Sequence, residues 1–261
     1  MQPSLELEPH GADTFVGTSP DYPWGRIYGG LVVAQSLAAA TATVDPEHHV
    51  HSLHAYFILG GVPNEPVRYE VDRIRNGRSF STRRVVARQS GGAILNLAAS
   101  FHRHEDGPVA EGVGMPVDVP DPDDVEKSHW DSGFDYREID PPPELGRSLA
   151  WARYTGPLGD DPRLHACALA YLSDGNAMDA IVGRHPVTPR TPEEWGETFV
   201  SASLDHAVWF HEPVRADEWC LFDMHSPHVG GSRGVARGEV FQDGRLVATV
   251  AQEGLLRLRT H

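Results

Sequence analysis

The spacing of apolar positions along the chain changes repeatedly, and in two places it predicts a helix. In residues 31–44, LVVAQSLAAATATV, the apolar residues Val33, Leu37, Ala40 and Val44 are spaced by four, three and four. This spacing puts them on one helical face, and the alanines favour a helix as well. A second run, PRLHACALAYLSD at residues 162–174, also predicts a helix.

Strand-like runs follow each predicted helix. Asn76-Gly77 and Asp243-Gly244 are typical of hairpin turns between such runs. The runs span residues 51–59, 67–75, 81–89 and 93–103 in the first half, and residues 200–211, 218–226, 232–242 and 245–259 in the second.

The second half repeats the order of the first. Ser52 in VHSLHAYFILGG aligns with Ser203 in SASLDHAVWFHEP at an offset of 151 residues, and Gly92 aligns with Gly244 at 152. This near-constant offset indicates a duplicated unit, in which one helix precedes a four-stranded antiparallel meander. Each sheet has one face that must be covered, and the helix can cover it. We therefore expect a duplicated α+β fold, with units at residues 1–103 and 148–261.

Residues 104–147 separate the two units. This stretch is rich in proline and acidic residues and lacks a clear hydrophobic period. Such a composition predicts a linker that wraps the surface.

Composition narrows the class of protein. The chain has 261 residues and a net charge of −15, which argues against binding to nucleic acids or anionic membranes. No apolar run approaches the length of a membrane span, and the N-terminal MQPSLELEPHG does not resemble a signal peptide. Cys167 and Cys220 lie in hydrophobic surroundings, so we expect two buried free thiols and a cytoplasmic location.

Three polar residues stand out against the apolar pattern. Asp174 ends the second helical run, where a negative charge opposes the helix dipole and so needs a reason. Gln252 lies late in the last strand and aligns with Ser100, while Ser203 aligns with Ser52. Taken singly, each has an ordinary structural explanation: a turn, a solvated strand face or a repeated structural serine. The difference between Gln252 and Ser100 indicates that only one half carries chemistry.

Several motifs, in order, resemble those of the acyl-CoA thioesterase II family. They are GRIYGG, VHSLHAYFI, NGRSFSTRRVVARQ and AASFH in the first half, and YLSDGN, SASLDHAVWFHEP and VAQEG in the second. The resemblance covers residues 20–103 and 148–258. It implies a double hotdog, two tandem helix-on-antiparallel-sheet units packed as an internal pseudo-dimer. It also implies hydrolysis of acyl-CoA to free CoA and a carboxylic acid in fatty acid metabolism, without metal or other cofactor, by a homodimer or higher homo-oligomer.

The family uses an Asp, a Thr and a Gln to hold the attacking water. By resemblance these roles fall on Asp174, Ser203 and Gln252, and the serine keeps the hydroxyl of the family's threonine. Leu31 replaces the glutamine that usually follows Gly29-Gly30 in the family, a departure that bears on substrate fit.

The remaining expectations concern the surroundings of these three residues. We expect Gly30, His54 and Tyr56 to line the substrate pocket, and backbone N–H groups after Gly29-Gly30 to bind the oxyanion. Asp205 and His206 are candidates to support the site or to make structural hydrogen bonds.

Four alternatives compete with this interpretation. GGSRG at residues 230–234 matches the G-x-S-x-G elbow of α/β-hydrolases, which needs a helix after Ser232. A hotdog enoyl-CoA hydratase would need a histidine five residues after Asp174, where this chain has Asp179. A metal site could use His48, His49, His51 and His54, although no Cys or carboxylate pattern completes it. A non-catalytic acyl-CoA-binding or scaffold protein is the alternative from a different class.

Overall fold

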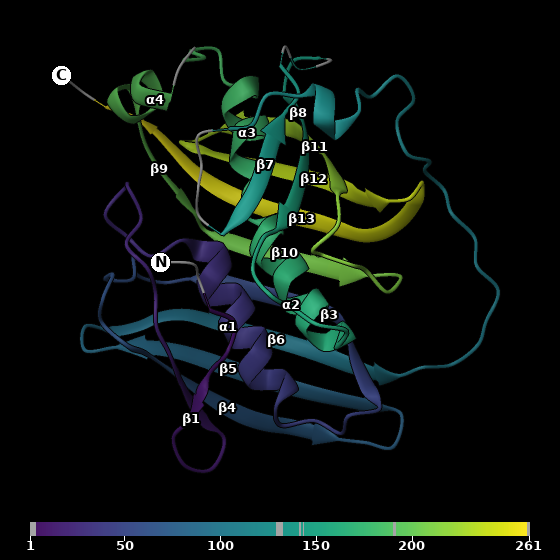
Figure 1. The fold of residues 1–261 in the computed structure, drawn as a ribbon. Coiled ribbons are helices and arrows are strands. Elements are labelled where there is room, and N and C mark those ends of the chain that lie inside the picture. Colours follow the sequence, from purple (N-terminus) through teal and green to yellow (C-terminus); the bar gives the residue numbers. More distant parts are fainter. Residues whose placement is uncertain (1–3, 129–132, 141, 143, 190–191, 260–261) are drawn as a thin grey trace.

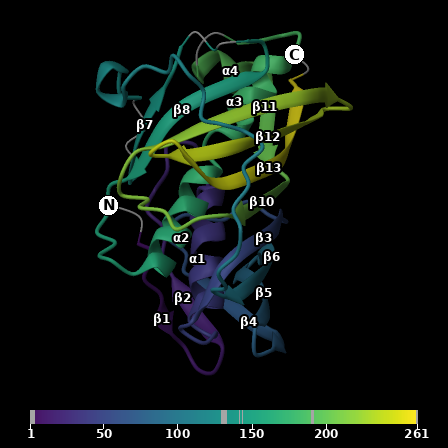
Figure 2. The ribbon, with the colours of Figure 1, turned by 90° about the vertical axis from the view of Figure 1, so that its right-hand side faces the viewer.

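Two antiparallel helices lie side by side against one face of a curved antiparallel sheet (Figures 1 and 2). The computed structural model describes residues 4–128, 133–140, 142, 144–189 and 192–259. The central helices are α1, Gly29–Thr41, and α2, Pro162–Ser173, close to the two predicted helices. No helix within the described residues is both long enough and apolar enough to cross a bilayer.

Strands of both halves join in a single sheet. Its order is β1-β2-β4-β5-β6-β3-β10-β13-β12-β11-β8-β7, with β9 also paired to β13. The first-half strands are β1 Glu8–Pro9, β2 Thr14–Gly17, β3 His48–Phe57, β4 Val67–Asn76, β5 Phe80–Gln89 and β6 Gly92–Arg103. The second-half strands are β7 Phe134–Glu138, β8 Arg147–Tyr154, β9 Phe199–Ser203, β10 Asp205–Phe210, β11 Cys220–Gly230, β12 Arg233–Gln242 and β13 Arg245–Leu258.

The helices form the centre of the hydrophobic core. Residues along α1 such as Leu31, Val33 and Leu37 are completely buried, because α1 contacts β4, β5 and β6 on one side and α2 on the other. In the second half an additional short helix, α3, Ala177–Arg184, packs against β11, β12 and β13. The predicted double hotdog is confirmed in this arrangement of two helix-and-sheet units.

The position of β3 differs from the predicted meander. β3 pairs with β6 and with β10, while β4 lies at the far side of its unit beyond β5. β10 occupies the equivalent place in the second half, next to β13. The two first strands therefore meet at the centre, where Tyr56 pairs with Asp205 and Ser52 with Trp209. This pairing leaves no unpaired strand edge between the halves.

The structural repeat has a different offset from the sequence alignment. β5 and β6 pair Arg83 with Ala99, and β12 and β13 pair Ala236 with Gln252, an offset of 153 residues in both strands. The counterpart of Gln252 is therefore Ala99 and not Ser100. A shift of one residue moves a side chain to the opposite sheet face, so the predicted pairing of Gln252 with Ser100 joined two different faces.

The same offset corrects the alignment of the first strands. His54 pairs with Ala98 as Ala207 pairs with Ala251, so β3 and β10 also differ by 153 residues. Ser52 therefore matches Asp205, and Ser203 lies before β10, at the end of β9. The shared Ser-Leu dipeptide, which suggested the sequence alignment, does not mark an equivalent position.

The predicted linker contains some regular structure. The described part of residues 104–147 includes the short 3₁₀ helix η1, Pro122–Asp124, and strand β7, which pairs with β8 at the sheet edge. Residues 129–132, 141 and 143 of the linker lie outside the described residues. Residues 104–121 have no helix or strand. The segment first arches away from the body (Figure 1), and then Met115 and Val119 pack against a buried cluster that includes Leu149 and Trp151. The predicted boundaries of the three regions stay predictions.

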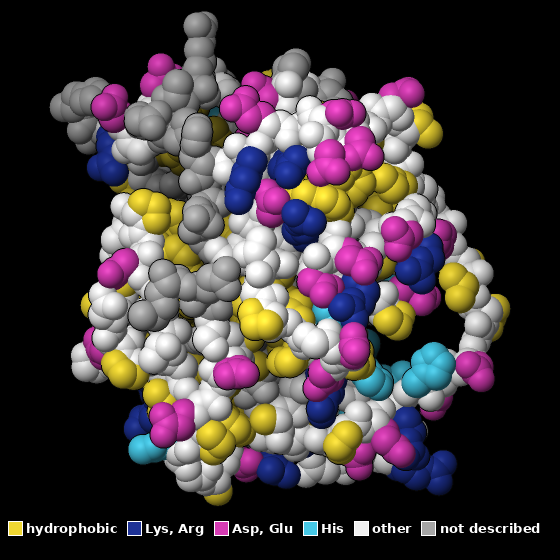
Figure 3. Space-filling model, in the orientation of Figure 1, with side chains coloured by type: hydrophobic (Ala, Val, Ile, Leu, Met, Phe, Trp, Pro, Cys, Tyr) yellow, Lys and Arg dark blue, Asp and Glu magenta, His cyan; other side chains and the backbone are white. Residues whose placement is uncertain are grey.

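Charged groups are spread over the surface. On the face shown in Figure 3, acidic and basic side chains alternate with hydrophobic ones, and neither sign forms a broad continuous field. The net charge of −15 therefore leaves room for local basic clusters.

Candidate active site

The first member of the predicted trio, Asp174, lies where α2 ends and α1 begins. Asp174 is the C-cap residue of α2, and its side chain is buried, with 6% of the residue exposed. Gly30, in the first turn of α1, donates its backbone N–H to the carboxylate. A Cβ at Gly30 would collide with the carbonyl oxygen of Tyr171, so the glycine permits the close approach of the two helices.

Ser203 reaches Asp174 because the predicted strand at residues 200–211 is interrupted. β9 ends at Ser203 and β10 begins at Asp205, with Leu204 between them. The Ser203 hydroxyl donates to Asp174 Oδ1 over 3.1 Å. The interruption thus places the hydroxyl at the end of α2.

Gln252 completes the contact between the three residues. Its strand, β13, places Gln252 on the buried face of the sheet with 1% exposure. Gln252 Nε2 donates to Ser203 Oγ over 2.9 Å, and the same amide group is hydrogen-bonded to Asp174. The structure therefore brings Asp174, Ser203 and Gln252 into one hydrogen-bonded cluster, which we call the Asp174 cluster.

His206 fixes the orientation of the Gln252 amide. Its Nδ1 lies 2.6 Å from Gln252 Oε1, and its Nε2 lies 2.8 Å from Ser173 Oγ. Because an amide oxygen only accepts hydrogen bonds, Nδ1 carries the proton and Nε2 accepts from Ser173. Burial lowers the pKa of His206 to about 4, so the ring is neutral near pH 7. The Gln252 NH₂ group is consequently directed at Ser203 and Asp174.

The carboxyl group of Asp174 is tuned by opposing effects. Burial raises its pKa to about 7, while the hydrogen bonds from Ser203, Gly30 and Gln252 lower it. Its position at the C-terminus of α2 is unfavourable for a negative charge. The N-terminus of α1 has neither a side-chain cap nor an acidic residue in its first turn, so its positive end is available to Asp174. The neighbouring helix explains why an aspartate is tolerated there.

Two of the predicted substrate-binding residues lie elsewhere. Side chains alternate along β3, so Leu53 and Ala55 point toward the helices, whereas His54 and Tyr56 are exposed on the outer face. Tyr56 is 64% exposed. Gly30 is the one predicted lining residue that the structure brings to the Asp174 cluster, and the other two are separated from it by the sheet itself.

Asp205 and Leu31 make contacts that stabilise the fold. Asp205 Oδ1 accepts the backbone N–H of Glu253 over 2.6 Å, which stabilises the chain where β9 gives way to β10. Leu31 is fully buried in the core around α1. The side-chain hydrogen bonds of Asp174 are made with Ser203 and Gln252 instead.

A second carboxyl group, which is partly buried, was not anticipated as part of this region. Asp179 lies on α3 and accepts a hydrogen bond from Tyr136 over 3.1 Å, and burial raises its pKa. Tyr136 also donates to Asn176 Oδ1. The Asn-Ala-Met-Asp sequence at residues 176–179 contains an N-cap residue followed by an acidic residue in the first turn, a signal that could have revealed α3.

The hydrolase-elbow alternative does not fit the structure. Ser232 lies in the hairpin turn between β11 and β12, where Gly231 and Ser232 both have positive φ angles. A strand follows it, and the elbow needs a helix at that position. For the metal alternative, the described residues contain no group of three or more His, Cys, Asp or Glu side chains arranged to hold a metal ion.

Most of the chain is similar to known acyl-CoA thioesterases. Residues 18–102 match the family model of the acyl-CoA thioesterase N-terminal domain, and residues 110–256 match that of the C-terminal domain. Human acyl-coenzyme A thioesterase 8 is 36% identical over 98% of this chain and 88% of its own length. Acyl-CoA thioesterase 2 from Haemophilus influenzae is 32% identical over 97% of this chain and 95% of its own.

Solved structures show the same architecture. The acyl-CoA thioesterase II TesB2 from Mycobacterium marinum has a TM-score of 0.84 and 39% identity, covering 98% of this chain and 97% of that one. A protein with a hot dog fold from Alicyclobacillus acidocaldarius has a TM-score of 0.75 and 22% identity, covering 98% of this chain and 97% of that one. The second likeness supports the fold alone.

Proposed function

This chain belongs to the acyl-CoA thioesterase family, and we propose that its Asp174 cluster activates the water that hydrolyses the thioester. Membership makes the protein a thioester hydrolase acting on acyl-CoA. The observation that carries the assignment of residues is the contact of Ser203 and Gln252 with the Asp174 carboxylate.

The chemistry requires no covalent intermediate with the protein. A thioester carbonyl is already reactive, so a water molecule held beside it can attack once a base accepts its proton. In this proposal ionised Asp174 accepts that proton, while Ser203 and the Gln252 amide fix the position of the water oxygen. The C–S bond then breaks, the proton passes to the CoA sulfur, and a carboxylic acid and free CoA remain.

The N-terminus of α1 supports the oxyanion of the tetrahedral intermediate. The Gly30 N–H donates to the Asp174 carboxylate in this structure. A protonated carboxyl group is a weaker acceptor, so the transfer of a proton to Asp174 frees this N–H at the moment when the substrate oxygen becomes negative. The uncapped positive end of α1 stabilises the same charge.

The raised pKa of Asp174 suits this role. A general base works best when its pKa lies close to the working pH, and burial places the pKa of Asp174 at about 7. An exposed aspartate would be a far weaker base.

A direct assay tests the proposal. The purified chain is mixed with acyl-CoAs of several chain lengths, and the released CoA thiol is measured with a thiol reagent while the fatty acid is identified by mass spectrometry. We expect release that is unchanged by a metal chelator. Binding of acyl-CoA without release would support the non-catalytic alternative, and activity that a chelator removes and zinc restores would contradict the mechanism.

Two finer expectations accompany this function. We propose that the enzyme acts in fatty acid metabolism and that its chains associate into a homodimer or larger homo-oligomer, as the family resemblance implies. Light scattering coupled to gel filtration tests the second, and a monomeric mass would contradict it. The cytoplasmic location stays a prediction from the sequence.

A further inference from the structure

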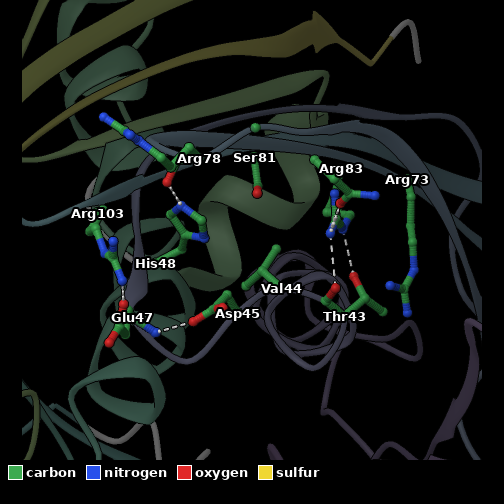
Figure 4. Close-up of a pocket in the computed structure, with 12 residues that line it drawn as sticks. Thr43, Val44, Asp45, Glu47, His48, Arg73, Arg78, Ser81, Arg83 and Arg103 are labelled. Atoms are coloured by element: carbon green, nitrogen blue, oxygen red, sulfur yellow. Dashed lines mark hydrogen bonds and ion pairs between the residues drawn. The ribbon is translucent and has the colours of Figure 1, made fainter.

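A cavity of about 500 Å³ lies at the C-terminal end of α1, at the opposite end of that helix from Asp174. Figure 4 shows residues around it that come from the α1–β3 connection, the start of β3, β4, the β4–β5 turn, β5 and β6. The residues lining it are Thr43, Val44, Asp45, Glu47, His48, Arg73, Asn76, Gly77, Arg78, Ser81, Arg83 and Arg103.

The cavity exists because the two halves are covered differently. In the second half, α3 packs on β11, β12 and β13, and its residues Ile181 and Met178 approach Gly234 and Gly254 closely. The structural repeat places β4, β5 and β6 at the equivalent positions in the first half. There the chain passes from α1 directly to β3, so no helix fills this space.

Strand pairing shows how the cavity corresponds to the Asp174 cluster of the second half. Arg83 pairs with Ala99 as Ala236 pairs with Gln252. The buried Arg83 on β5 thus lies directly opposite Ala99, which is the first-half counterpart of Gln252. The first half therefore has a cavity with a charged lining where the second half has α3.

Arg83 brings a positive charge into this hollow without a carboxylate partner. It is 1% exposed, and its N–H groups donate to neutral oxygens of Thr43, Arg75, Asn76 and Thr82. Every donor is satisfied, yet within the part of the chain that the structure describes no acidic group forms an ion pair with it. A buried cation of this kind favours an anion nearby.

The other charges around the cavity are partly paired. Arg73 is bound by Asp13 over 2.8 Å, and Arg103 forms an ion pair with Glu47. Asp45 accepts the backbone N–H of Glu47. The Arg78 side chain is exposed at the rim, and the described residues offer it no ion-pair partner. Arg78 and Arg83 are therefore the two lining cations without an ion-pair partner among the described residues, and the Asp45 carboxylate has none either. The lining keeps one net positive charge.

Two buried polar side chains are available to contact a ligand directly. His48 is 6% exposed, and its Nε2 lies 3.3 Å from the carbonyl oxygen of Arg78, which only accepts. His48 Nδ1 is buried and has no hydrogen-bond partner among the described residues. Ser81 is 3% exposed, and its hydroxyl points into the space enclosed by the residues of Figure 4. A buried polar atom without a partner is costly, so a ligand that supplies one would be stabilised.

We propose that this cavity binds a phosphate group, either as inorganic phosphate or as a phosphomonoester of a small molecule. Phosphate matches the set of groups because its oxygens accept from Ser81, a P–O–H group can donate to His48 Nδ1, and the exposed Arg78 guanidinium adds positive charge at the rim. The positive charge of Arg83 stabilises the phosphate charge through space, without a direct hydrogen bond. The volume leaves room for the organic part of a phosphomonoester.

Calorimetric titration of the full chain tests the proposal with two probes, sodium phosphate and adenosine 3′,5′-bisphosphate. Saturable binding of inorganic phosphate would identify a site for the phosphate group alone, and binding of the bisphosphate only would identify an organic phosphomonoester. Both results support the proposal, and the absence of saturable binding by either probe overturns it.

Three variants locate the binding. Arg78→Ala removes a side-chain cation but keeps the carbonyl group that binds His48, and we expect affinity to fall about tenfold. Ser81→Ala should weaken binding similarly. Arg84→Ala is the matched control, because Arg84 is exposed on β5, the strand of Ser81. It is paired with Asp72 and does not line the cavity.

A variant in the Asp174 cluster distinguishes binding in the cavity from binding in the thioesterase site. Asp174→Asn should leave the affinity for both probes unchanged, because Asp174 lies at the other end of α1. Unchanged affinity in Arg78→Ala and Ser81→Ala, together with loss in Asp174→Asn, would place the probe in the thioesterase site and overturn the proposal. These outcomes do not depend on hydrolytic activity, so they remain informative if the proposed function fails.

Discussion

Gln252 and Ala99 occupy the same register position in the two halves, but only Gln252 is hydrogen-bonded to a carboxylate. The neighbouring positions on the first strands differ in the same way, because His206 corresponds to the fully buried Leu53. The duplication has therefore kept the backbone of both halves while the polar side chains gather in one. We therefore expect one catalytic site per chain.

Replacing Asp174 by asparagine should abolish most of the activity while preserving the shape of the site. Asparagine cannot accept the proton of the attacking water, and loss of a general base typically lowers kcat by about 10²–10⁴. We expect KM to change little, because the contacts with Ser203 and Gln252 remain possible. Steady-state kinetics of CoA release measures both constants.

Asp179→Asn is a matched control for this experiment. Asp179 is also a carboxyl group whose pKa is raised by burial, but it binds Tyr136. We expect its substitution to leave kcat within severalfold of the wild type. An equal loss of activity in both variants would show that a buried charge in this region, and not the base at Asp174, supports turnover.

The pH dependence of kcat/KM should follow the ionisation of Asp174. Its pKa of about 7 means that the carboxyl is protonated, and inactive as a base, at lower pH. We expect kcat/KM to rise about tenfold per pH unit below 7 and to level off above it. A profile that is flat between pH 5 and pH 8 is incompatible with Asp174 as the base in this environment.

Ser203 should influence both the rate and this profile. Its hydrogen bond lowers the pKa of Asp174, so Ser203→Ala should shift the rise of the profile to higher pH and reduce kcat about tenfold or more. Ser203→Thr keeps the hydroxyl and is the control that should retain both rate and profile. A Ser203→Ala variant with a wild-type pH profile would show that the hydroxyl does not act on Asp174.

Asp174 and His206 should affect stability with opposite signs as pH changes. Folding raises the pKa of Asp174 from 3.8 to about 7, so its contribution is full below pH 4 and is lost as pH rises toward 7. Folding lowers the pKa of His206 from 6.5 to about 4, so its contribution is present above pH 6.5 and is lost as pH falls toward 4. At about 1.4 kcal/mol per pKa unit, the effect is worth up to about 4 kcal/mol for Asp174 and about 3 kcal/mol for His206, and in the wild type the two partly offset one another.

Asp174→Asn should expose the contribution of His206. The free energy of unfolding of this variant should increase from pH 5 to pH 7 by more than that of the wild type does, and the variant should be the more stable protein at pH 7. Urea denaturation at the two pH values measures the difference. If both proteins show the same change, the carboxyl of Asp174 has an ordinary pKa in the folded state.

The closeness of the two central helices can be tested at Gly30. A Cβ at this position collides with the backbone carbonyl of Tyr171, which cannot move independently of α2. We expect Gly30→Ala to lower the free energy of unfolding by about 1–3 kcal/mol and to reduce activity by displacing α1 from Asp174. Gly91→Ala, where no atom lies within 4 Å of the new Cβ, should be nearly neutral in both respects.

The sequence predicted elements well where apolar spacing was regular. Residues 162–174 and the strands of β4 and β5 matched closely, because their periodicity directly reflects burial. The spacing does not report which strand edges pair, so the central position of β3 was not predicted. The interruption at Leu204 was also missed, because neither glycine nor proline marks it.

The members of the candidate site were predicted from family motifs, and their contacts needed the structure. The unfavourable position of Asp174 was visible in the sequence, but its compensation comes from the N-terminus of α1, far away along the chain. The error at Ser100 shows a limit of repeat alignment, since a difference of one residue decides which face of the sheet a side chain occupies.

The pairing of β3 with β10 has a consequence for the connection between the halves. Backbone hydrogen bonds and the contact of α1 with α2 hold the two units together, whereas residues 104–114 arch around the outside. The peptide bonds of this segment are therefore not needed to keep the units associated. A chain cut there by a protease would remain one particle in native buffer and would separate into two fragments only in denaturant. Two such fragments, made from separate genes, would have matching central edges through which to reassemble.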